Sequence, residues 1–204
     1  MNETLYKKVM KLDLPIDHVA EVGVFYPETS NVLGFIHDGK KTDLFEPDPL
    51  CIEKIEEAFS NYKNVTLYPY AIYDKKETVG LYRTNASTFV KGLEASPALV
   101  NDKYQPKDED LFEAEGRLFS EFDDGTIDIL SIDTEGCEWY VLKNMTSQPK
   151  IISVETHGKK YRNTYYKEIM SWMDDHGYRK WYADGSDTVF IKKNIKFPFL
   201  SKWF

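Results

Sequence analysis

The sequence predicts one α/β domain with a Rossmann-like, mostly parallel seven-stranded sheet and an antiparallel terminal strand. Three observations indicate this class. Short apolar runs alternate with amphipathic helical segments, as expected for strands joined by crossover helices. The 204 residues, numbered 1–204, fit one domain with helices on both faces of a sheet. The last two apolar runs are separated by Asp184-Gly185-Ser186, a tight connection typical of an antiparallel pair.

Short apolar runs bounded by turn formers mark the expected strands. They cover residues 18–24, 42–45, 65–70, 78–82, 127–132, 151–154, 178–182 and 188–191. The run at 78–82 alternates between apolar and polar residues, as an edge or hairpin strand does. The runs at 18–24 and 127–132 are mostly apolar, which favours buried strands.

Helical segments lie between several of these strands, with apolar residues at three- and four-residue spacing. They cover residues 30–36, residues 50–59, a stretch that carries Trp139, Val141 and Leu142, and residues 163–176. Thr29 or Ser30 can serve as the N-cap of the first helix. Asp48 suits the N-cap of the second helix and Pro49 its first position, while Gly177 stands where a C-terminal cap requires positive φ.

The stretch between residues 85 and 124 shows no sustained periodicity. It contains turn formers and many acidic residues, and a short helix is expected only around 118–122. Exposed polar loops often carry specificity. We therefore expect this stretch to be a lid or variable insertion that shapes the substrate pocket.

Composition excludes several classes of partner. The net charge is −8 and no long cluster of basic residues occurs, which argues against a nucleic-acid partner. No apolar stretch approaches the roughly 18 residues that span a membrane, and residues 1–11 are too charged for a signal peptide. We therefore expect a cytoplasmic protein, with Cys51 and Cys137 as buried packing residues. The sequence does not indicate an oligomeric state.

Functional residues are expected just after the strands, because ligands of doubly wound sheets bind outside the carboxyl ends of strands. Glu21, Gly23, Glu46, Asp133 and His157 occupy such positions. The glycine lets a backbone approach a ligand, although it could serve only the turn. An acid about 20 residues further on can accept hydrogen bonds from both ribose hydroxyls. The second and third glycines of the dinucleotide motif are missing, so a cofactor without a pyrophosphate is favoured.

Four motifs occur in order along the chain. They are Glu-Val-Gly at 21–23, Phe-Glu-Pro-Asp-Pro at 45–49, Ile-Asp-Thr-Glu-Gly-Cys-Glu at 132–138 and Val-Glu-Thr-His at 154–157. Together they resemble the FkbM family of methyltransferases, and the Asp-x-Glu-Gly-x-Glu element is the specific part. The resemblance implies a class I methyltransferase fold with S-adenosylmethionine as cofactor. It also implies O-methylation of a hydroxyl on a small-molecule or sugar/glycan acceptor.

The resemblance further implies where the cofactor binds. The implied cofactor site consists of Glu21, Gly23, Val24, Phe25, Ser30, Asn31, Glu46, Pro47, Ala71 and Asp133. Within it, Glu21 and Gly23 would meet the amino-acid moiety, Glu46 the ribose, and the stretch that begins at Ala71 the adenine.

Three residues depart from the family pattern. Glu21 stands where aspartate is commoner, Phe25 where asparagine is usual and Pro27 where glycine is usual. One alternative is therefore a binding protein that keeps the fold without catalysis. Another is a nucleotide-dependent oxidoreductase, although the missing glycines argue against it.

Methyl transfer needs an aligned acceptor oxygen and a group that takes its proton. Asp133 is the first candidate for this base or for orienting the acceptor, and His157 is the second. No metal is required by this interpretation. As an alternative, Asp133, Glu135, Glu155 and His157 could converge on magnesium or manganese. For Glu135 and Glu138, a place near a helix N-terminus is explained by the helix dipole alone.

Overall fold

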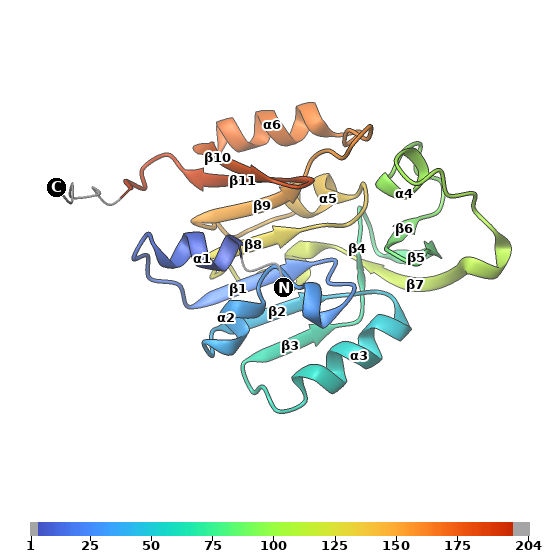
Figure 1. Ribbon diagram of the computed structural model, residues 1–204, viewed down its shortest axis with the longest axis horizontal. Coiled ribbons are helices and arrows are strands. Elements are labelled where there is room, and N and C mark those ends of the chain that lie inside the picture. The colour runs from blue at the N-terminus through green and yellow to red at the C-terminus, as the bar shows by residue number, and fades with distance from the viewer. Residues whose placement is uncertain (1–3, 198–204) are drawn as a thin grey trace.

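The computed structural model describes residues 4–197 and contains a central sheet and a smaller second sheet (Figure 1). The central strands are β1 (His18–Val22), β2 (Lys41–Phe45), β3 (Val65–Tyr68), β8 (Ile129–Ile132), β9 (Ile151–Glu155), β10 (Tyr178–Asp184) and β11 (Asp187–Lys192). Their order is β10-β11-β9-β8-β1-β2-β3. β11 alone runs opposite to the other six strands of this sheet. The expected class I methyltransferase fold is confirmed.

Helices cover both faces of the central sheet. They are α1 (Thr4–Met10), α2 (Leu33–His37), α3 (Pro49–Phe59), α5 (Glu138–Leu142) and α6 (Tyr166–Asp175). On one face Phe35 of α2 and Ile55 of α3 belong to the same buried cluster as Val19 of β1. On the other face Val141 of α5 and Ile169 of α6 pack with the opposite side of the strands. None of the described helices is long and apolar enough to cross a membrane.

The helix ends follow local capping chemistry, with one correction. Asp48 caps α3 by accepting a hydrogen bond from the Leu50 backbone N–H at 2.8 Å, as expected. The first crossover helix begins later than expected. Residues 27–29 form a separate 3₁₀ turn, η1, and α2 starts at Leu33. Val32 rather than Ser30 therefore occupies the N-cap position of α2, and the Ser30 hydroxyl donates to Glu21 while it accepts from the Val32 backbone N–H.

The second sheet corrects the expectation that residues 85–124 lack regular structure. It consists of β4 (Ala71–Ile72), β5 (Glu77–Arg83), β6 (Thr88–Val90) and β7 (Leu111–Arg117), in the order β4-β7-β5-β6. A short helix, α4 (Pro97–Val100), lies between β6 and β7. The expected short helix near 118–122 is the 3₁₀ turn η3 (Phe119–Glu121). The alternation of β7 is weak in sequence because the residues that alternate with its two exposed acids include the small Ala114 and Gly116.

The second sheet lies beyond the carboxyl ends of the central strands (Figure 1). Leu81 of β5 and Val90 of β6 pack in one buried cluster with Cys137, just before α5. Arg83 of β5 forms a bidentate ion pair with Asp48, which is fully buried. The second sheet is therefore attached both to the start of α3 and to the start of α5. Cys51 and Cys137 are free and buried, as expected.

Candidate active site

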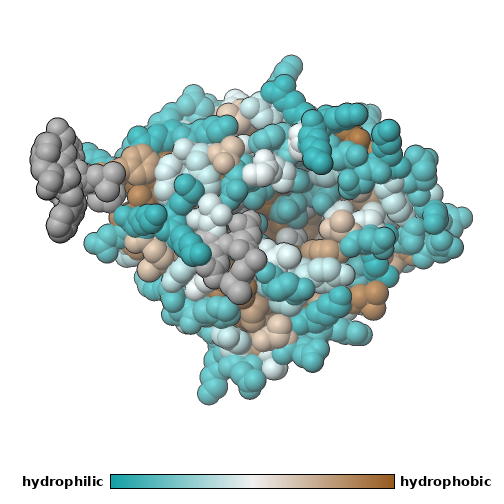
Figure 2. Space-filling view, in the orientation of Figure 1, coloured by the Kyte–Doolittle hydropathy of each residue, from teal (hydrophilic) through white to brown (hydrophobic). Residues whose placement is uncertain are grey.

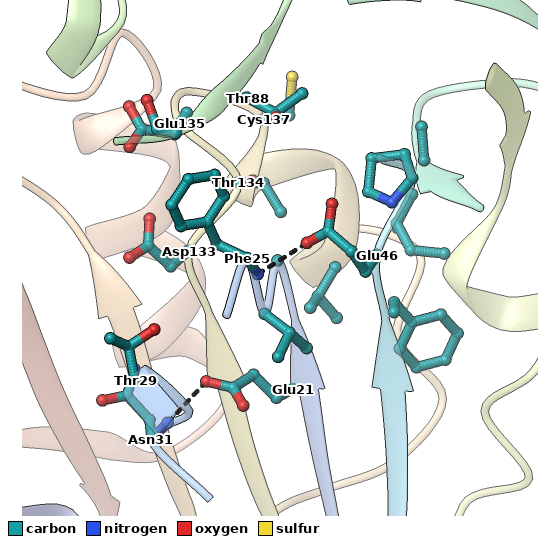
Figure 3. A pocket seen from close by; sticks show the side chains of 18 of the residues that line it. Glu21, Phe25, Thr29, Asn31, Glu46, Thr88, Asp133, Thr134, Glu135 and Cys137 are labelled. Atoms are coloured by element: carbon teal, nitrogen blue, oxygen red, sulfur yellow. Dashed lines mark hydrogen bonds between the residues drawn. The ribbon is translucent and has the colours of Figure 1, made fainter. Parts of the chain in front are cut away.

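A cavity of about 600 Å³ lies between the carboxyl ends of the central strands and the second sheet. Hydrophilic residues cover most of the molecular face seen in Figure 2. Of the expected site residues, the cavity is lined by Glu21, Gly23, Val24, Phe25, Asn31, Glu46, Pro47, Ala71 and Asp133 (Figure 3). The carboxyl ends of the central strands thus bring together residues that are far apart in the sequence.

Glu21 on β1 is a buried carboxylate held by the turn that follows. Its Oε2 accepts a hydrogen bond from the Ser30 hydroxyl at 2.5 Å, and its Oε1 accepts one from the Asn31 backbone N–H at 2.8 Å. The side chain of Asn31 donates in turn to the Ser131 hydroxyl at 3.1 Å. Burial raises the pKa of Glu21 to about 7. Ser30 does not line the cavity itself, so it contributes by fixing Glu21.

Glu46 directly follows β2 and is also buried. Its Oε2 accepts from the Phe25 backbone N–H at 2.8 Å and its Oε1 from the Asp48 backbone N–H at 2.9 Å. Burial raises its pKa to about 7. Each oxygen keeps a second lone pair, so this carboxylate can accept further hydrogen bonds from two ligand hydroxyls.

Gly23 lines the cavity and also has a packing role that the sequence did not indicate. Its φ is +85°, and a Cβ at this position would lie 1.8 Å from the backbone oxygen of Asp133. The glycine therefore lets the end of β1 pack against the end of β8, as well as supplying the left-handed conformation. No side chain can replace it without moving one of these two strand ends.

The turn after Gly23 accommodates both Phe25 and Pro27, the two residues that depart from the family pattern there. Phe25 has φ +58°, in the left-handed region that favours glycine and asparagine. Its ring packs on Tyr26 with centroids 4.1 Å apart. Pro27 occupies the first turn of η1, where its missing N–H is not needed. Neither departure removes the backbone N–H that Phe25 donates to Glu46.

Sequence reasoning missed the second wall of the cavity. Leu81, Ser87 and Thr88 line it from the second sheet and its β5–β6 connection, and Asp187 lines it from β11. The turn formers around residues 84–87 and the hairpin at 184–187 were the available signals, but turn chemistry alone explains such residues. The place of these residues on the wall depends on the second sheet, of which the sequence indicated only the strand at 78–82, now seen as β5.

Acidic groups dominate the wall that follows β8. Burial, reinforced by the nearby charge of Glu135, raises the pKa of Asp133 well above its usual value. Burial likewise raises the pKa of Glu135 to about 7. Figure 3 shows Glu135 and Thr88 at the opposite end of the view from Glu21 and Asn31. The cavity therefore has two regions with carboxylates in both.

The structure does not place His157 on the cavity, which corrects the expectation that it joins Asp133 there. The backbone N–H of His157 donates to the Ser186 carbonyl at 3.3 Å, so the chain turns toward the β10–β11 connection. Its Nδ1 lies 2.9 Å from the Thr156 hydroxyl. Being next after a strand end is therefore not sufficient to direct the imidazole into the cavity.

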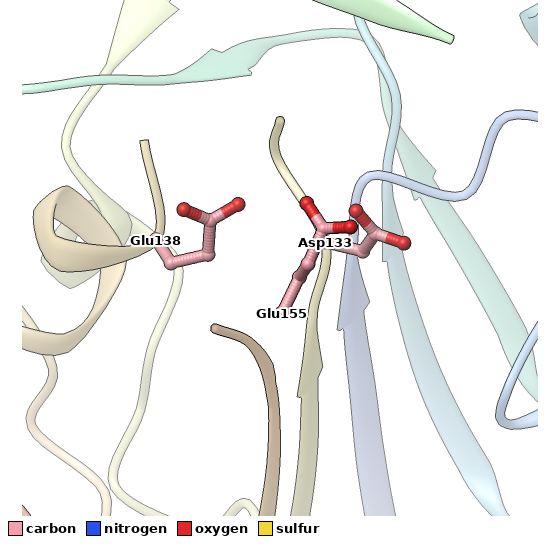
Figure 4. A group of neighbouring side chains, drawn as sticks. All are labelled: Asp133, Glu138 and Glu155. Atoms are coloured by element: carbon pink, nitrogen blue, oxygen red, sulfur yellow. The ribbon is translucent and has the colours of Figure 1, made fainter. Parts of the chain in front are cut away.

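The structure also corrects the set of groups that could hold a metal. Asp133, Glu138 and Glu155 offer ligand atoms that lie within 4.8 Å of one another (Figure 4). Glu135 and His157, which the sequence suggested, are not in this group. Glu138 takes their place because the turn at 134–137 directs the start of α5 toward the ends of β8 and β9.

Comparison with solved structures gives distant likenesses at the level of the whole chain. The precorrin-6y C5,15-methyltransferase from Geobacter metallireducens is 13% identical, with 92% of this chain and 88% of that chain covered and a TM-score of 0.43. A SAM-dependent methyltransferase from Aquifex aeolicus is 12% identical, with 93% and 87% covered and a TM-score of 0.43. The fibrillarin from Aeropyrum pernix, in complex with natively bound S-adenosyl-L-methionine, is 12% identical, with 93% and 73% covered and a TM-score of 0.47. Values this low carry no information about the substrate.

Comparison with curated proteins gives no match. The Methyltransferase FkbM domain family matches residues 17–180, which include β1, the second sheet and the start of the final hairpin. The match covers most of the chain and all four motifs. The chain therefore belongs to the FkbM methyltransferase domain family and is a methyltransferase that depends on S-adenosylmethionine.

Proposed function

We propose that the chain transfers a methyl group to a hydroxyl oxygen of a small-molecule or glycan acceptor, with Asp133 acting on that hydroxyl. The observation that carries the proposal is the position of Asp133. Its carboxylate lines the cavity directly after β8, next to Thr134 and Glu135 and close to the turn of Gly23. A group that can accept a proton therefore lies on the cavity wall beside the elements that would hold the cofactor.

The residues around the cavity fit S-adenosylmethionine. Glu21 offers a fixed carboxylate for the cofactor's ammonium group, and Glu46 offers two oxygens for its ribose hydroxyls. Ala71 and Ile72 supply buried apolar surface next to Glu46 for the adenine. The cofactor carries no phosphate, so the single glycine of the turn is sufficient.

The chemistry of the proposed reaction is an in-line displacement. When bound, S-adenosylmethionine supplies an electrophilic methyl group, to which the acceptor oxygen bonds as the carbon–sulfur bond breaks and sulfur keeps the electron pair. Asp133 accepts the hydrogen bond of the acceptor hydroxyl, orients it and receives its proton. Its raised pKa increases its basicity relative to an exposed carboxylate.

The size and charge of the cavity favour a small, uncharged or cationic acceptor. A volume of about 600 Å³ lies within the range of about 300–1,000 Å³ for small-molecule sites. Among the described residues that line it, none is lysine, arginine or histidine. A nucleic acid would bring phosphates to a wall that carries Glu135 and Asp187, so it is not the proposed acceptor.

The test is methyl transfer from labelled S-adenosylmethionine to a panel of hydroxylated small molecules and glycosides, with Asp133→Asn and His157→Ala as matched variants. We expect Asp133→Asn to lower turnover by about 10²–10⁴-fold with little change in cofactor affinity. His157→Ala should retain turnover, because its ring does not line the cavity. The assignment is wrong if the effects on the two variants are reversed.

A binding protein without catalysis remains the competing function. The turn geometry does not favour it, because Phe25 and Pro27 leave the hydrogen bond to Glu46 intact. The methyl-transfer panel separates the two functions, with calorimetry as the measurement that shows whether the cofactor binds. A chain that binds S-adenosylmethionine but transfers no methyl group to any compound in the panel would support the binding function.

A further inference from the structure

Three carboxylates meet where β8, β9 and α5 come together. Asp133 directly follows β8, Glu155 is the last residue of β9 and Glu138 is the first residue of α5. Their ligand atoms all lie within 4.8 Å of one another. Figure 4 shows Asp133 and Glu155 adjacent, with Glu138 pointing toward them. Because Asp133 also lines the cavity, this acidic cluster adjoins the region proposed for the acceptor.

The acidic cluster has oxygens without partners. Glu155 is only 5% exposed, and its Oε2 is buried with no hydrogen-bond partner. Oδ1 of Asp133 is likewise buried and unpartnered. Within residues 4–197, no lysine, arginine or histidine forms an ion pair with any of the three carboxylates. Buried carboxylates are paired, protonated or bound to a metal, so a proton or a cation must satisfy these oxygens.

We propose that Asp133, Glu138 and Glu155 hold a divalent metal cation of the hard, oxygen-binding class. Carboxylate oxygens are the ligands that such cations prefer. The 4.8 Å span of the ligand atoms is about twice a metal–oxygen distance of about 2.0–2.6 Å, so one ion can reach all three groups. Two positive charges also offset more of the mutual repulsion than one shared proton does.

Glu138 is oriented for this role by the backbone around it. Its Oε1 accepts hydrogen bonds from the backbone N–H groups of Thr134 at 2.9 Å and Gly136 at 3.0 Å. Its Oε2 accepts one from the side-chain amide of Asn163. Such supporting bonds fix the direction of a metal-binding carboxylate. Of the three groups, Glu155 and Asp133 each carry a buried oxygen without a hydrogen-bond partner.

The contribution of the cation to catalysis rests on the proposed function. A divalent cation beside the acceptor lowers the pKa of a hydroxyl bound to it and fixes the direction of that hydroxyl. Asp133 would then help as a ligand, and the proton of the hydroxyl would leave to solvent as the carbon–oxygen bond forms. Asp133→Asn therefore lowers turnover whether Asp133 acts as the base or as a metal ligand. Only a measurement of metal binding separates these two roles.

The experiment is a titration of the full chain with Mn²⁺ alone, followed by the loss of the electron paramagnetic resonance signal of free Mn²⁺. We expect one tightly bound ion per chain. Asp133→Asn and Glu155→Gln should each raise the dissociation constant about tenfold or more, because each removes a charged ligand. Glu113→Gln is the matched control, since Glu113 is an exposed carboxylate on β7 and its loss should leave binding unchanged.

The proposal is overturned if the wild-type chain binds no Mn²⁺, or if both variants bind it as tightly as the wild type. Either result would mean that protons neutralise the acidic cluster. Circular dichroism identifies a variant that fails to fold, in which case the other variant decides. The titration contains neither methyl donor nor acceptor. A failure of metal binding therefore leaves the proposed O-methylation standing, and a failure to find an acceptor leaves the metal site standing.

Discussion

Glu21→Gln should raise the free energy of unfolding of the ligand-free protein and lower its affinity for S-adenosylmethionine. The carboxylate is 2% exposed, and its pKa rises from 4.5 to about 7 because burial disfavours the charged form. The difference, 7 − 4.5 or 2.5 units, corresponds to about 3 kcal/mol at about 1.36 kcal/mol per unit. Ionised Glu21 therefore lowers the free energy of unfolding by this amount relative to the protonated side chain.

The sign of the pH dependence follows from the raised pKa. Glu21 stabilises the folded state fully below pH 4.5, where it is protonated in both states. That stability is lost as the pH rises through about 7. Glutamine stays neutral at every pH. Its oxygen can still accept from the Asn31 backbone N–H, and its amide can donate to the Ser30 hydroxyl, which also accepts from Val32.

Urea unfolding at pH 4.5 and at pH 8 measures the effect. We expect Glu21→Gln to match the wild type at pH 4.5 and to be about 2–3 kcal/mol more stable at pH 8. Calorimetry at pH 8 should show S-adenosylmethionine binding about 10–100-fold weaker, because a charge-assisted hydrogen bond is lost. Glu113→Gln, on the exposed face of β7, should change neither quantity. A stability difference that is the same at both pH values would refute the reasoning.

Three further predictions concern the neighbouring turn and the second sheet. Glu46→Ala should weaken S-adenosylmethionine binding by about 10–100-fold, and an unchanged calorimetric affinity would remove Glu46 from the site. Phe25→Asn should raise the free energy of unfolding by about 1 kcal/mol, because asparagine tolerates φ +58° better; a lower urea midpoint would contradict this. Arg83→Met should cost about 2–4 kcal/mol, because it leaves the fully buried Asp48 without its ion pair. A loss below about 0.5 kcal/mol would indicate that the second sheet is held by apolar packing alone.

The central sheet could be predicted because its strands are buried on both faces. Every residue of β8 and β9 is buried, so each strand appears in the sequence as a mostly apolar run. The second sheet could not be predicted in the same way. In β7 the residues that alternate with the exposed Glu113 and Glu115 include Ala114 and Gly116, which are too small to produce a clear hydrophobic alternation.

The part of the cavity at the ends of the central strands was more predictable than the part lined by the second sheet, for a related reason. Glu21 and Glu46 sit on or next to central strands, whose carboxyl ends meet at one edge of the sheet. The other wall of the cavity depends on residues of the second sheet and its β5–β6 connection, such as Thr88 and Ser87. A strand-end rule also predicts only the edge where a residue lies. Such a rule does not predict the direction of the side chain. The prediction that His157 faces the cavity is wrong for this reason.

The segment from Asp133 to Glu138 shows why one motif can serve fold and site together. Gly136 has φ +117°, which lets the chain turn back on itself between β8 and α5. Glu138 closes this turn by accepting hydrogen bonds from the backbone N–H groups of Thr134 and Gly136, so the turn itself uses a side-chain acceptor at this position. The same bonds bring its carboxylate to Asp133 and Glu155. Removing Glu138 would disturb the turn as well as the acidic cluster, so loss of metal binding in such a variant would not identify a ligand. Substitutions at Asp133 and Glu155 avoid this ambiguity, because both carry buried oxygens without a protein partner.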